Sequence, residues 1–223
     1  SVTANAANAL GTSEVDVGGT LNLNAADTLA NVLSGAGTIN TGAAVTLSGS
    51  NDFSGTHVID ANGALTISTA DNLGTSAARV NLADATSQLL LNGFAGTLAN
   101  TLSGVLDSTV QLSNASNTTL TGTNSSFAGL FDLIGSSTLT VSQNANLGTG
   151  GVSIGSGSTL NFNAFEGGAL TALNNSLSGT GNWVLRNSNI NLSGSNNAAG
   201  FSGLLDINTG ASLTLNGATT LDA

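Results

Sequence analysis

The chain has 223 residues and a net charge of −10, with twelve acidic side chains against only two basic ones, Arg79 and Arg186. Nucleic-acid binding needs basic residues to neutralise phosphates, so this excess of acidic residues excludes nucleic acids as partners. It also excludes electrostatic attraction to anionic lipid. The absence of Cys excludes a disulfide framework, a thiolate metal site and a Cys nucleophile.

Short segments that alternate apolar and polar residues recur along the chain, with the period of a half-buried strand. Gly, Ser, Asn and Asp, which favour turns, separate them. Hydrophobic residues make up 40% of the chain and Pro is absent, as expected where interior strands must donate their N–H groups. The segments lie at 14–24, 45–47, 65–67, 80–82, 89–91, 110–112, 152–154, 160–162 and 190–192.

The spacing of these segments favours a parallel β-helix. Selected strand positions are evenly spaced: the steps are 24, 20, 24 and 21 residues through Leu21, Val45, Leu65, Leu89 and Val110, and 21, 24 and 23 through Leu139, Leu160, Val184 and Ile207. A coil of about 20–25 residues with three short strands forms one rung, which advances ~4.8 Å along the axis. We predict an all-β fold of roughly ten rungs that forms one domain over 1–223. Asn-Gly pairs at 62–63, 92–93 and 216–217 leave a β-sandwich with hairpins as the alternative.

One step, from Val110 to Leu139, is longer than the others and does not fit this spacing. Either a loop is inserted between them or the two residues lie on different faces of the solenoid. The sequence leaves both explanations open.

A longer stretch occurs three times, beginning at Phe53, Phe127 and Phe201, with a constant period of 74 positions (127 − 53 and 201 − 127). A fixed period of this kind indicates a stacked array, here about three rungs per copy. We expect the Phe side chains to pack at corners and Trp183 to replace an inward residue. Aliphatic residues follow each Phe at fixed offsets and are expected to be inward: Ile59, Leu133 and Ile207, then Leu65, Leu139 and Leu213, then Leu73, Leu147 and Leu221. Outward Ser, Thr and Asn are expected to form ladders.

A second phrase, Leu-Ser-Gly, occurs at 33–35, 102–104 and 177–179. Each copy lies upstream of a Phe block and is rich in turn residues. We interpret the phrase as the turn that precedes each block.

The candidate chemical residues form no strong pattern. His57 is the only possible imidazole base, and although Ser54 and Asp60 are near it in sequence, it occupies the repeat position of two apolar residues, Phe131 and Leu205. Arg79 follows His57 by about one rung, so these two side chains could stack on one face.

The acidic residues are scattered, whereas a β-helical glycosidase needs a close carboxylate pair. Glu14 and Asp16 share one face of a strand but lack a calcium loop. We predict no catalytic residue, no cofactor and no metal ion.

Three phrases of the first copy, at 53–55 (Phe-Ser-Gly), 63–65 (Gly-Ala-Leu) and 72–74 (Asn-Leu-Gly), resemble the passenger-associated repeat of autotransporter passenger domains. The second copy repeats Phe-Ala-Gly at 127–129 and Asn-Leu-Gly at 146–148, with Ser137 in place of the middle Gly. The third copy has Phe-Ser-Gly at 201–203 and Ala211 at that middle position. The resemblance covers nearly the whole chain and is to β-helices of the diffuse-adherence adhesin and pertactin type.

This resemblance implies a right-handed parallel β-helix at the surface of a Gram-negative bacterium, tethered by a C-terminal outer-membrane barrel outside this sequence. We therefore expect a piece of a longer passenger. Its function would be adhesion or autoaggregation, through self-association between cells or binding to a host surface protein or glycan. A passive stalk that carries an upstream functional head is the alternative. A β-helical carbohydrate-active enzyme is a further, less favoured one.

Overall fold

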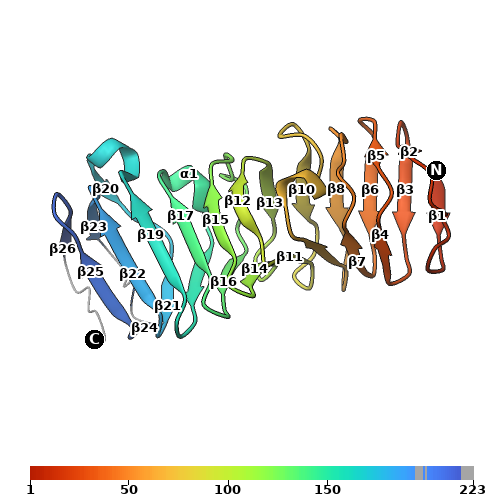
Figure 1. The fold of residues 1–223 in the computed structure, drawn as a ribbon. Helices are drawn as coiled ribbons and strands as arrows, with labels where there is room; N and C mark the ends of the chain where they lie inside the picture. The colour runs from red at the N-terminus through yellow and green to blue at the C-terminus, as the bar shows by residue number, and fades with distance from the viewer. Residues whose placement is uncertain (194–197, 199, 217–223) are drawn as a thin grey trace.

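The computed structural model describes residues 1–193, 198 and 200–216. The chain winds into a parallel β-solenoid of about ten turns, seen from the side in Figure 1. At ~4.8 Å per turn, ten turns make a rod roughly 50 Å long. Every strand pairing in the described residues is parallel. The predicted parallel β-helix is therefore confirmed, and the sandwich is wrong because Asn62-Gly63 joins strands of two different sheets.

The described residues form five parallel sheets, in which each strand pairs with a strand of the turn before it, the turn after it, or both. Sheet A contains β1 (Val2–Ala4), β3 (Thr20–Leu23), β6 (Thr38–Thr41), β8 (Thr56–Ile59), β10 (Arg79–Leu82) and β13 (Thr101–Gly104). Sheet B contains β2 (Val15–Asp16) and β5 (Leu33–Ser34). Sheet C contains β4 (Asp27–Leu29), β7 (Ala44–Leu47), β9 (Ala64–Ile67), β11 (Gln88–Asn92), β14 (Thr109–Ser113), β16 (Leu130–Leu133), β18 (Gly151–Ile154), β21 (Leu177–Gly179) and β24 (Gly200–Phe201).

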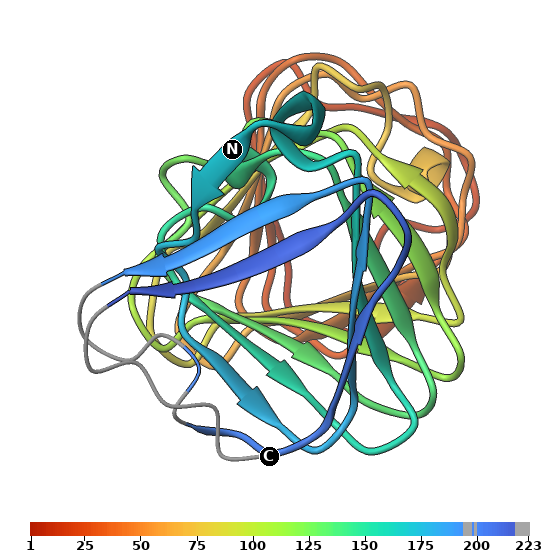
Figure 2. The same cartoon turned by 90° about the vertical axis from the view of Figure 1, so that its left-hand side faces the viewer.

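The remaining two sheets belong to the later turns. Sheet D contains β12 (Ala95–Leu98), β15 (Asn117–Leu120), β17 (Thr138–Val141), β19 (Thr159–Asn163), β22 (Asn182–Arg186) and β25 (Leu204–Ile207). Sheet E contains β20 (Leu170–Ala172), β23 (Asn189–Ser193) and β26 (Ser212–Asn216). In the described part of the chain, three short helical segments form corners: η1 (Ala70–Asn72), α1 (Asn144–Leu147) and η2 (Phe165–Gly168). Figure 2 looks along the stack and shows the turns wound around one enclosed interior.

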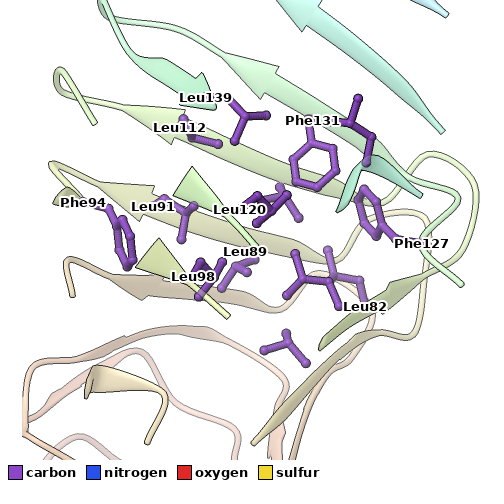
Figure 3. Close-up of a cluster of buried hydrophobic side chains, with 14 of the residues drawn as sticks. Leu82, Leu89, Leu91, Phe94, Leu98, Leu112, Leu120, Phe127, Phe131 and Leu139 are labelled. Atoms are coloured by element: carbon purple, nitrogen blue, oxygen red, sulfur yellow. The ribbon is translucent and has the colours of Figure 1, made fainter. Parts of the chain in front are cut away.

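The core fills this interior because buried and outward side chains alternate along the strands. In β3, Leu21 and Leu23 point inward while Asn22 lies between them on the outside. Figure 3 shows leucines and phenylalanines of successive turns meeting in a continuous apolar column. Fully burying one such side chain is worth about 1.5–3 kcal/mol, so strands of four residues hold together through their stacking.

The register resolves the irregular step between Val110 and Leu139. Val110 lies in β14 of sheet C and Leu139 in β17 of sheet D, so the two residues are on different faces and no loop insertion is needed. Leu21 likewise belongs to sheet A and pairs with Ile39, not with Val45 of sheet C. The spacings read from the sequence were therefore of two kinds. Some join equivalent positions of successive turns, and others, such as the step from Leu21 to Val45, join positions in two different sheets.

The sequence repeat is close to three turns, but it is not a whole number of turns. Starting at Ile59, three turns lead through Leu82 and Gly104 to Phe127. The repeat equivalent of Ile59 is Leu133, which lies about one strand farther along the chain, at the end of β16. Equivalent strands of the three copies therefore lie in different sheets: β8 in sheet A, β16 in sheet C and β25 in sheet D.

The Leu-Ser-Gly phrases are strands, and their prediction as turns is wrong. They form β5, most of β13 and β21, with Leu33, Leu102 and Leu177 buried. Leu points inward and Ser outward, which is the alternation of a strand, and three residues were too few to separate it from a turn.

Candidate functional site

Within a copy, residues of the first and last repeated phrases meet at one corner of the solenoid. Phe53 is fully buried, and a Cβ on Gly55 would overlap the Gly37 carbonyl of the turn below and lie 2.6 Å from Cζ of Phe53. One turn later Gly74, at φ 103°, lies against the Phe53 carbonyl, where a side chain would clash. Phe127, Gly129 and Gly148 repeat this arrangement in the second copy. The phrases are thus explained by close stacking of consecutive turns.

Buried asparagine side chains form hydrogen bonds with backbone N–H and carbonyl groups near these corners. Asn72 Nδ2 donates to the Gly49 carbonyl at 3.0 Å, and its Oδ1 accepts from the N–H of Ser68 and Thr69, both at 3.0 Å. Asn146 makes the equivalent bond to the Gly122 carbonyl at 3.1 Å. A buried backbone group left unpaired costs roughly 1–3 kcal/mol, so these amides are structural.

The other repeat positions lie on the inner side of the strands. Phe201 is 2% exposed, and Ile59, Leu133, Leu65, Leu139, Leu73 and Leu147 are fully buried. Leu213 is partly buried. Ile207 is 45% exposed, since β25 is the last strand of sheet D in the described part of the chain. Leu221 lies outside the described residues. Trp183 is buried and pairs with Leu160.

His57 is a core residue with no access to solvent. Its Nε2 lies 2.9 Å from the Leu73 carbonyl, and its ring packs edge-on against Phe53 with centroids 4.9 Å apart. Phe131 packs against Phe127 at the same separation in the second copy. Burial lowers the pKa of His57 to about 4, so the ring is neutral at physiological pH. Ser54 and Asp60 are not among its hydrogen-bond partners in the described residues.

The structure does not bring the predicted charged residues together. Arg79 is outward beside Thr56, whereas His57 is inward beside Val80, so the suggestion that Arg79 and His57 share a face is wrong. Strand alternation gives the reason, since the two residues differ by one position in the register. No group of three His, Cys, Asp or Glu side chains that could hold a metal ion occurs in the described ranges. Glu14 precedes the two-residue strand β2, which contains Asp16.

Hydrogen-bonded ladders of polar side chains line the outer faces. On sheet A, Asn40 Nδ2 donates to Asn22 Oδ1 at 2.8 Å, and Asn22 Nδ2 donates to Thr3 Oγ1 at 3.2 Å. Similar contacts join Ser103 to Asn81 on sheet A, Gln111 to Asp132 on sheet C, Asn161 to Thr140 on sheet D, and Ser212 to Asn189 on sheet E. These contacts join outward side chains of consecutive turns.

Comparisons with known proteins found no matching protein-family model, curated protein or solved structure. The resemblance to autotransporter passengers therefore rests on the repeated phrases alone. Among the described residues, no helix is long and apolar enough to cross a membrane.

Proposed function

We propose that this chain is a surface-exposed autotransporter passenger segment that acts in bacterial adhesion or autoaggregation. Its outer polar faces would contact an identical rod on a neighbouring cell, or a protein or glycan on a host surface. The supporting observation is the stack of hydrogen-bonded Thr, Ser and Asn side chains along a regular rod.

The outward residues of sheet A suit contact between two copies best. Apart from Val58 and Arg79, these residues carry amides or hydroxyls that both donate and accept hydrogen bonds, so most of the face is complementary to itself. The strands of sheet A contain no Asp or Glu, although the chain carries twelve acidic residues. Two such faces can therefore meet with less charge repulsion than the net charge of −10 suggests. Each hydrogen bond adds about 0.5–1.5 kcal/mol net, and many rods between two cells add avidity.

A clumping assay tests this proposal. Bacteria would display the fragment on a neutral barrel, and labelled displaying cells would be mixed with unlabelled cells that do or do not display it. We expect displaying cells alone to sediment together. Thr38→Glu places a negative charge on the sheet A face and should reduce clumping, with partial recovery at higher salt. The control is Thr138→Glu, at the equivalent strand position on sheet D.

The alternative function is a passive stalk that carries an upstream functional head. The corner geometry favours it, because Phe53, Gly55, Asn72 and Gly74 all serve the stacking of turns. Adhesion predicts that the fragment alone makes cells clump or bind host surfaces. A stalk predicts neither, and that outcome would overturn adhesion.

A further inference from the structure

A hollow of about 260 Å³ interrupts the surface at the corner that leads from sheet A to sheet C. One wall is Leu106, in the loop between β13 and β14, whose side chain is 69% exposed. The other wall is Leu130, the first residue of β16. Gly129, Gly151 and Ser176 also line the hollow, which therefore draws on four consecutive turns.

The hollow arises from differences in side-chain size between neighbouring turns. In the register of sheet C, Leu130 lies beside Gly151, and a Cβ on Gly151 would be only 3.5 Å from Cδ1 of Leu130 and 2.8 Å from Oγ of Ser176. The absent side chain lets Leu130 and Ser176, from the turns on either side, approach Gly151 closely, and all three residues line the hollow. Outward residues of β16 and the residue after it are Leu130, Asp132 and Ile134, while those of the next turn are Gly151, Ser153 and Gly155. A row of large side chains on one turn thus lies beside a row of small side chains on the next turn.

The protruding loop is held in place by its own backbone. Ser108 donates to the Val105 carbonyl through its N–H at 3.2 Å and through Oγ at 2.7 Å. A Cβ on Gly129 would overlap the Ser108 carbonyl, so the next turn packs directly beneath the loop. Leu106 is therefore exposed by a fixed turn and is available to a partner without rearrangement.

The surroundings of the hollow are acidic. Asp107 lines it, and Asp132 lies two residues after Leu130 on the same outer row. The side chain of Gln111 donates to Asp132 Oδ2 at 3.1 Å and fixes this carboxylate. The strands of sheet C contain no Lys or Arg, since Arg79 lies in sheet A and Arg186 in sheet D. A partner here meets apolar walls flanked by uncompensated negative charge.

We propose that this hollow docks an extended, basic segment of another protein. One large apolar side chain of the segment fills the space between Leu106 and Leu130, and a Lys or Arg two residues away pairs with Asp132. Successive residues of an extended chain are ~3.3 Å apart, so an apolar and a basic side chain at positions i and i+2 match the spacing of Leu130 and Asp132.

The exposure of its walls supports a segment over a small molecule. Sites for drug-sized ligands or cofactors enclose most of the ligand. One wall of this hollow, Leu106, is itself largely exposed, as expected where a single side chain of a larger partner is anchored. The inference does not depend on self-association, because it concerns sheet C and not the polar face of sheet A.

The test is binding of a labelled nonapeptide, Leu-Ser-Lys-Ser-Leu-Ser-Lys-Ser-Leu, to the purified chain, followed by fluorescence anisotropy at two salt concentrations. We expect saturable binding that weakens with salt, and much weaker binding of the same peptide with Glu in place of Lys. Leu106→Ser removes an exposed apolar wall and should weaken binding about tenfold, the loss expected from uncovering part of one leucine. Asp107→Asn together with Asp132→Asn should remove most of the salt dependence.

The repeat supplies matched controls. Leu204 and Asp206 occupy the repeat positions of Leu130 and Asp132, but they lie on sheet D. Leu204→Ser and Asp206→Asn should leave peptide binding unchanged. Equal binding of the Lys and Glu peptides, no binding to the wild type, or equal losses in the sheet D variants would each overturn the proposal. The clumping assay on Leu106→Ser keeps the two hypotheses apart, because normal clumping with lost peptide binding separates the docking site from self-association.

Discussion

The first turns and the later turns of this solenoid fill their interiors in different ways. The narrow turns, from β1 to β8, take 19 residues from Thr3 to Asn22 and 18 from Asn22 to Asn40. The wide turns, from β8 onward, are longer, with 22 residues from Asn81 to Ser103. A longer turn encloses a wider cross-section, and aromatic rings fill the space that aliphatic side chains leave open. No aromatic residue precedes Phe53, yet many buried rings follow Phe94 in the chain: Phe127, Phe131, Phe162, Phe165, Trp183 and Phe201.

The largest expected effect tests whether the rings fill this wider interior. Phe127→Ala should lower the free energy of unfolding by about 3–5 kcal/mol, because the ring is fully buried and the surrounding turns cannot collapse onto the cavity. Urea unfolding followed by circular dichroism measures the change. Ile39→Val in the narrow turns is the comparison, with an expected loss of about 0.5–1.5 kcal/mol. A loss below about 1 kcal/mol for Phe127→Ala would contradict its role as core filler.

Much of this architecture can be predicted from the sequence, because inward residues must recur with the turn. The offsets from Phe53 to Ile59 and Leu65 predict three buried positions without any structure. The rotation of the copies from sheet A to sheet C to sheet D could not be predicted, since short strands separated by turn residues do not show where a turn ends.

The hollow was also missed by sequence analysis, and for a related reason. Leu106, Leu130 and Gly151 come from three different turns, and only the register brings them together. One signal was present in the sequence: Leu130 is an apolar residue at a position that alternation assigns to the outside.

The pH dependence of stability tests the boundary between the two kinds of turn. In sheet A, His57 lies between Ile39 of the preceding narrow turn and Val80 of the following wide one, and both neighbours are apolar. Its pKa is about 4 in the folded state against 6.5 for the ordinary group, so the unfolded chain takes up the proton first. Stability is therefore full above pH 6.5 and decreases toward pH 4, by about 3 kcal/mol from this residue.

The control for this pH effect is His57→Phe, which copies the Phe127–Phe131 pair of the second repeat. Both proteins contain the same carboxylates, so the difference between their unfolding curves isolates the imidazole. We expect the variant to be nearly independent of pH between 6.5 and 4.5. Identical pH profiles in the two proteins would rule out His57 as the source of the acid sensitivity.

A smaller effect is expected at the glycine corners, which both regions share. A Cβ on Gly37 would overlap the Gly19 carbonyl in the narrow turns, and a Cβ on Gly150 would overlap the Gly129 carbonyl in the wide ones. Gly37→Ala and Gly150→Ala should each cost about 1–3 kcal/mol through overpacking between consecutive turns. Gly18→Ala, where nothing lies within 4 Å, is the control for urea unfolding. Unequal losses at Gly37 and Gly150 would show that the two regions differ at their corners as well as in their cores.

The smallest effect concerns the outer ladders, where the narrow and wide turns should behave alike. Asn40 donates to Asn22 on sheet A at 2.8 Å, and Asn161 donates to Thr140 on sheet D at 3.3 Å. Asn40→Ala and Asn161→Ala should each cost at most about 0.5–1.5 kcal/mol, because water replaces a lost bond at a partly exposed site. If Asn40→Ala abolishes clumping while stability barely changes in urea unfolding, and Asn161→Ala does not, the sheet A ladder serves contact between molecules. A larger stability loss at Asn40 would instead assign the ladder to the fold, because the side chain would then be needed to hold neighbouring turns together.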